Sequence, residues 1–133
     1  MTDFDSLAGR TGPKDLSNLW EAFFKLEEWI FVVDASLPSE NPAPFVGFIE
    51  EKPWLFVFTD TQRAYEFAKQ NQLLDSRGEC LFISTKTDAA RKMLATTKSG
   101  VEGIRVNEGP HGWFSPLANI EKIHALLKKE GRL

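Results

Sequence analysis

The stretch WLFVFTDTQRAYEFAKQ, residues 54–70, sets the fold class of this 133-residue chain. Residues 54–58 are apolar at odd and even positions alike, so a strand there needs cover on both faces of its sheet. Thr59 and Gln62 follow at the spacing of a capping box. Three residues then recur at the spacing of one helical face: Ala64, Phe67 and Ala68. The stretch therefore predicts a buried strand followed directly by a helix.

Apolar strands and amphipathic helices continue toward the N-terminus. Residues 1–14 contain Gly9, Gly12 and Pro13 among polar neighbours, which predicts a loose arm. The elements expected after it are a helix capped by Asp15 and running to Glu28, a strand over 29–35, a loop over 36–44, and a strand over 45–50 that a tight reversal at 51–53 joins to the strand 54–58.

The C-terminal half repeats the alternation. The elements expected here are an interior strand over Cys80–Ser84, a helix from Thr87 that buries Ala90, Met93 and Leu94 and stops at Gly100, a hairpin of strands over 101–109 and 111–115, and a last helix capped by Ser115 with Pro116 at its first position. Four residues of the last helix are expected to point inward: Leu117, Ile120, Ile123 and Leu127.

This order of elements predicts an α/β fold with α+β character. We expect a mixed sheet of five or six strands with a parallel βαβαβ segment, flanking hairpins and about four helices. A chain of this length forms one core, so residues 15–133 are expected to be a single domain behind the arm.

Composition excludes several classes of protein. Cys80 is the single cysteine, which excludes internal disulfides and multi-cysteine metal clusters, and an apolar strand around it would raise its thiol pKa. A net charge of −3 argues against a protein that coats nucleic acid. The chain starts without a secretory signal and lacks a run of about 18 apolar residues, so we expect a cytoplasmic protein outside the membrane.

The stretch VNEGPHGWFS, residues 106–115, is the best candidate for chemistry. Asn107 and the glycines satisfy the demands of a hairpin turn, which accounts for most of the motif. Glu108 and His111 remain as an acid and a possible base, but general acid–base catalysis needs an oriented histidine. His124 is expected at the border of the last helix, and the two histidines do not form a metal pair. The sequence favours a protein without enzymatic activity, cofactor or metal.

Topology suggests where a ligand would bind. If the strands ending at Phe58, Ser84 and Val106 run in the same direction, the loops after them lie along one edge of the sheet, where open α/β sheets bind ligands. Lys86 and two helix N-termini there would suit a small anion. The predicted binding residues are Thr59, Asp60, Thr85, Lys86, Asn107, Glu108 and His111. The alternative is that these residues are caps and turn residues only.

Aromatic residues suggest a protein partner. Trp54, Trp113 and Phe114, with Phe4, exceed what a small core must hold, and an uncovered aromatic cluster marks an interface. A strand at the end of the sheet could also pair with another copy of the chain, giving a homodimer.

Two segments resemble the SseB-type N-terminal domain, a bacterial family named for enhanced serine sensitivity. The resemblance is carried by Phe58-Thr59 and Arg63-Ala64 in residues 54–70, and by Val101-Glu102-Gly103-Ile104 and Asn107-Glu108-Gly109 in residues 101–120. It implies a small cytoplasmic α/β domain with no established enzymatic role and no active-site residues to transfer. Longer members of that family continue into a second domain.

The sequence thus leaves two hypotheses. The first is a non-enzymatic α/β module that binds another protein or itself through aromatic surface or a sheet edge. The alternative is a small-ligand binder or an unrecognised enzyme that uses the loops at the carboxyl edge of the sheet.

Overall fold

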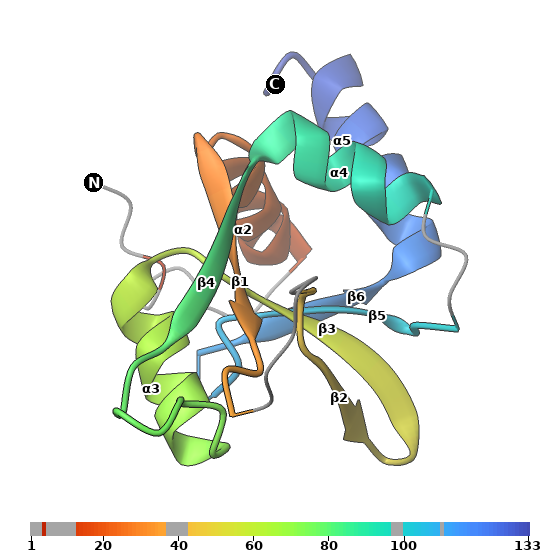
Figure 1. Ribbon diagram of the computed structural model, residues 1–133. Coiled ribbons are helices and arrows are strands. Elements are labelled where there is room, and N and C mark those ends of the chain that lie inside the picture. The colour runs from red at the N-terminus through yellow and green to blue at the C-terminus, as the bar shows by residue number, and fades with distance from the viewer. Residues whose placement is uncertain (1–3, 5–12, 37–42, 97–99, 110) are drawn as a thin grey trace.

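A computed structural model describes Phe4 and residues 13–36, 43–96, 100–109 and 111–133. The elements follow one another in the predicted order (Figure 1). They are α2 (Pro13–Phe24), β1 (Glu28–Val33), β2 (Val46–Ile49), β3 (Lys52–Phe58), α3 (Thr61–Gln70), β4 (Leu81–Lys86), α4 (Thr87–Thr96), β5 (Gly103–Val106), β6 (Trp113–Pro116) and α5 (Leu117–Lys129).

The strands form one mixed six-stranded sheet, which confirms the predicted fold class. Its order is β4-β1-β3-β5-β6, and β2 pairs with β3 as a hairpin. β1 is antiparallel to both β3 and β4, while β5 is parallel to β3. β3, β4 and β5 therefore run in the same direction, as predicted, but only β3 and β5 are hydrogen-bonded neighbours.

β1 lies between β3 and β4, and its residues suit an interior strand. Five of its six residues are buried, on both faces of the sheet. A strand with a continuous run of apolar residues needs cover on both faces. The prediction of Cys80–Ser84 as an interior strand is accordingly wrong: β4 is the outermost strand beside β1, and none of its six residues is fully buried.

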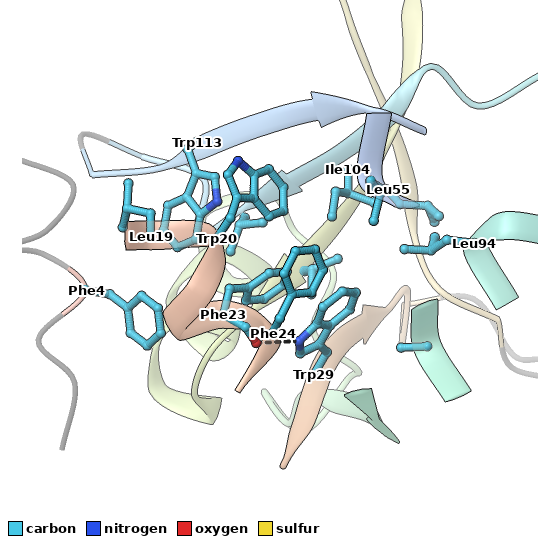
Figure 2. Close-up of a cluster of buried hydrophobic side chains, with 14 of the residues drawn as sticks. Phe4, Leu19, Trp20, Phe23, Phe24, Trp29, Leu55, Leu94, Ile104 and Trp113 are labelled. Atoms are coloured by element: carbon cyan, nitrogen blue, oxygen red, sulfur yellow. Dashed lines mark hydrogen bonds between the residues drawn. The ribbon is translucent and has the colours of Figure 1, made fainter. Parts of the chain in front are cut away.

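Helices cover both faces of the sheet. The larger core lies between one face and helices α2, α4 and α5 (Figure 2), and the smaller core lies between the other face and α3. In the larger core the ring of Phe23 stacks on Trp29 with 4.1 Å between centroids. The indole Nε1 of Trp29 donates a hydrogen bond to the backbone carbonyl of Phe23 at 3.0 Å, which joins the end of α2 to β1.

Several predicted boundaries differ from the structure. α2 begins at Pro13, so Asp15 lies inside the helix and is not its cap, and the helix ends at Phe24, ahead of the predicted Glu28. The reversal between β2 and β3 is made by Glu50 and Glu51, both with positive φ, while residues 52–53 already belong to β3. A two-residue hairpin loop needs that left-handed backbone.

Three predicted caps or core residues are also corrected. Asp60, and not Thr59, caps α3: its carboxylate accepts the backbone N–H of Arg63 at 2.8 Å. Ser115 lies within β6, and α5 begins after Pro116 without a side-chain cap. Met93 of α4 is 37% exposed, although the periodicity placed it in the core.

Parts of other predictions lie outside the described residues. Of the predicted arm, the structure describes Phe4, which is buried against Trp113, and residues 13–14, which open α2. The predicted loop over 36–44 is described only at residue 36 and from residue 43 on. Helix α4 is described up to Thr96, and the residues between it and the predicted stop at Gly100 lie outside the described part of the chain.

Candidate functional site

Asn107 holds the carboxyl ends of β3 and β5 together. Its side-chain oxygen accepts the backbone N–H of Thr59 at 3.0 Å, and its amide nitrogen donates to the Thr59 hydroxyl at 3.1 Å. Its own backbone N–H donates to the carbonyl of Val57 at 2.9 Å. Asn107 is buried and adopts a φ of 51°, a left-handed conformation that asparagine tolerates. These contacts give Thr59 and Asn107 a structural role at the predicted edge.

A groove lies beside this junction, between α3 and the connection from β5 to β6. Its volume is about 490 Å³. The lining residues are Asp60, Gln62, Arg63, Glu66, Phe67 and Gln70 from the α3 side and Asn107, Glu108, Gly109 and His111 from the β5–β6 side. Four predicted site residues thus meet here, namely Asp60, Asn107, Glu108 and His111. Sequence reasoning missed the contribution of α3, although its polar face at Gln62, Glu66 and Gln70 is a visible signal.

The charges of the groove are mostly negative and partly paired. The carboxylate of Asp60 lies 2.9 Å from the Arg63 guanidinium, and that of Glu108 lies 3.3 Å from Arg105. Glu66 is the third carboxylate in the lining. A cavity with this balance gives little support to the predicted anionic ligand, because opposite charge is what attracts an anion.

Thr85 and Lys86 do not line the groove. They lie at the end of β4, and β1 separates that strand from β3. The Lys86 ammonium is exposed and lies 2.7 Å from the Glu27 carboxylate. That hydrogen bond and the charge of Glu27 raise the pKa of Lys86 and lower the pKa of Glu27. The cation that motivated an anion site is therefore neutralised elsewhere.

The histidines and the cysteine are not arranged for catalysis in the described part of the chain. His111 is exposed in the groove, and no hydrogen bond orients it toward Glu108 among the described residues. His124 packs edge-on against Phe24, and burial, with the nearby Arg91 charge, lowers its pKa. Burial raises the pKa of the Cys80 thiol, as predicted, although Cys80 lies just before β4 and that strand is not interior. General acid–base chemistry needs an oriented pair, which these contacts do not supply.

The predicted aromatic interface divides into buried and exposed members. Trp54, Trp113 and Phe4 are buried, whereas Phe114 is 56% exposed. The Arg105 guanidinium, which sequence reasoning missed, lies 4.7 Å from the ring centre of Trp54 and 5.0 Å from that of Phe114. Phe114 is therefore the one residue of the predicted aromatic interface whose side chain is largely exposed to solvent. The other side of its ring contacts Arg105 and Trp54 of the same chain.

The two ends of the sheet differ in what their backbones offer. In β6, the hydrogen bond from Leu117 N–H to the Glu102 carbonyl fixes the pairing with β5, so the backbone groups of Phe114 and Pro116 face outward. Proline has no N–H, so Phe114 alone can donate. A short edge strand blunted by proline is protected against pairing with another strand.

β4 is an edge strand of six residues without proline, and no other strand of the described residues pairs with it beyond β1. The bond from Thr87 N–H to the Glu27 carbonyl fixes the alternation, so residues 81, 83 and 85 face β1. The bond from Phe45 N–H to the Val32 carbonyl, on the far side of β1, agrees with this pattern. The N–H and C=O groups of Phe82 and Ser84 and the N–H of Lys86 therefore point away from the sheet. The Lys86 carbonyl directly precedes α4 and accepts the first hydrogen bond of that helix.

Comparison of the chain with protein-family models, curated proteins and solved structures finds no match. The resemblance to the SseB-type domain therefore stays a prediction. In the described part of the chain, every helix is too short or too polar to cross a membrane.

Proposed function

We propose that this protein is a protein-interaction module that binds an extended segment of a partner by adding it to the sheet beside β4. The observation that supports the proposal is the row of outward backbone groups on β4, which consists of the N–H and C=O of Phe82 and Ser84 and the N–H of Lys86. Main-chain hydrogen bonds along such a row provide affinity, and side chains on alternate positions provide specificity. The other hypotheses of an anionic ligand or an enzymatic reaction gain no comparable support from the groove.

The side chains of β4 suit this mode of binding. Leu81 is 46% exposed, and Ser84 and Lys86 are exposed, so an added strand would meet both apolar and polar neighbours. Phe82 and Ile83 are half-buried against the two cores, which keeps the strand in place while its edge is open. A non-enzymatic, cytoplasmic, SseB-like role is compatible with this activity and remains part of the proposal.

Selection of binders from a random nine-residue peptide library tests the proposal. The key variant is Ser84→Pro, which removes an outward N–H and leaves the bonds between β4 and β1 intact, since the inward groups belong to residues 81, 83 and 85. We expect peptides rich in β-branched and aromatic residues to bind the unchanged protein and to lose at least tenfold in affinity for the variant. Bound peptide should also slow amide exchange at Phe82, Ser84 and Lys86.

Phe114→Ala is the matched control, since it removes the exposed aromatic ring at the opposite end of the sheet. Its binding should equal that of the unchanged protein. Peptides that bind Ser84→Pro with full affinity, or that require Phe114, would place the interaction elsewhere and overturn the proposal, as would a selection that yields no binder.

A further inference from the structure

We infer that the segment added beside β4 is the β4 strand of a second copy of this chain, antiparallel to the first, with the two-fold axis at Ser84. The inference rests on the proposed strand addition and names its partner. Identical strands pair isologously, so each contact occurs twice.

The register follows from the spacing of the outward backbone groups. They belong to residues 82, 84 and 86, which are placed symmetrically about Ser84. An antiparallel copy centred there sets Ser84 opposite Ser84 and Phe82 opposite Lys86. Each Ser84 N–H then meets the Ser84 C=O of the other copy, and each Lys86 N–H meets the Phe82 C=O of the other copy. Moving the centre by one residue in either direction sets Lys86 or Phe82 of each copy opposite a residue outside β4.

The charges of β4 permit this self-pairing. Residues 81–85 carry no charge, and the single charge, on Lys86, is neutralised by Glu27 of the same chain. In the proposed register the two Lys86 side chains lie at opposite ends of the paired strands. Like charges opposite one another destabilise a strand pair, and this register avoids them.

The second copy would also cover apolar side chains of β4 that are exposed or half-buried in the single chain. The alkyl stem of Lys86 would lie across from the half-buried ring of Phe82 in the other copy, and long basic side chains commonly cover apolar surface in this way. The exposed Leu81 would approach the start of α4 in the other copy. An interface built on one strand from each copy is small, so we expect a dissociation constant on the order of micromolar to tens of micromolar.

Sedimentation velocity from about 1 to 200 micromolar protein, a range chosen to span that expected constant, tests the inference with two charge variants. Ser84→Lys and Ser84→Asp each place two like charges opposite one another at the axis, and each should weaken the dimer by about fivefold or more. An equimolar mixture of the Ser84→Lys and Ser84→Asp variants should restore dimer formation, because the introduced lysine of one copy then lies opposite the introduced aspartate of the other. Ala125→Lys, which adds the same charge to an exposed position of α5, should leave the dimer unchanged.

The outcomes separate this inference from the proposed function. A protein that stays monomeric over the whole range, or a dimer that the mixture does not restore, overturns self-pairing at Ser84. If such a protein still selects peptides that depend on Ser84, the strand-addition function stands and its partner is a different chain. If it selects none, both proposals fail. Circular dichroism spectra of the variants should match that of the unchanged protein, which shows that a loss of dimer is not caused by a loss of folded structure.

Discussion

Replacement of Asn107 by alanine tests whether this residue is a structural clamp. The change removes the acceptor for the Thr59 N–H and the partner of the Thr59 hydroxyl, at a cost of about 2 kcal/mol for groups left unsatisfied at a part-buried site. It also leaves alanine at a φ of 51°, which costs about 1 kcal/mol more. We expect the free energy of unfolding to fall by about 3 kcal/mol, and the Tm by about 11 °C for a chain of this length.

Two further variants separate the parts of this loss. Asn107→Gly relieves the left-handed backbone but lacks the hydrogen bonds, so it should cost about 2 kcal/mol. Asn107→Asp keeps an acceptor for the Thr59 N–H and should cost about 1 kcal/mol. Urea denaturation at pH 7 measures all three. An alanine variant within 1 kcal/mol of the unchanged protein, or a glycine variant less stable than the alanine one, would refute the clamp.

Three other variants test local features of the fold. Gly103→Ala would drive a Cβ into a facing carbonyl of β6, so we expect a loss of about 3 kcal/mol by urea denaturation, and full stability would contradict the close pairing. Changing Glu50 and Glu51 to Asn-Gly should raise the free energy of unfolding by about 1 kcal/mol, because both positions have positive φ; no gain in thermal melting would contradict the turn. The hydrogen bond from Arg132 lowers the pKa of Glu21, so that contact stabilises the fold above the ordinary pKa of 4.5 and is lost as pH falls through the lowered value. Arg132→Ala should therefore destabilise by about 1 kcal/mol at pH 7 and by less at pH 3, and an equal loss at both pH values would contradict the assignment.

The candidate site could be predicted only in part. The loops after β3 and β5 carry Asp60, Asn107 and Glu108, and the structure brings these together because the two strands are parallel neighbours. The sequence predicts Lys86 in the same place because its strand runs in the same direction. The direction of the strands does not reveal that β1 lies between β3 and β4. The order of strands along the chain carries little information on which strands become neighbours in the sheet.

The open edge was missed for a related reason. An apolar run such as residues 80–84 reads as interior, yet Leu81 is 46% exposed and Ser84 is exposed. The polar residues Ser84 and Lys86, set two apart at the end of the run, were a signal that one side of the strand meets water. That signal consists of only two residues, whereas the four apolar residues before it, 80–83, indicate an interior strand.

The sequence by itself determined the type and order of the elements, since the helical and strand periods of residues such as Phe67 and Val57 depend only on near neighbours. It also determined the turn at Asn107, where few residues accept a left-handed backbone. Only the tertiary structure decided which strands became neighbours and which became edges. The physical reason is that the apolar faces of all the strands and helices must be covered at the same time. Which strand takes the central place, such as residues 29–33 of β1, therefore depends on the packing of the whole core.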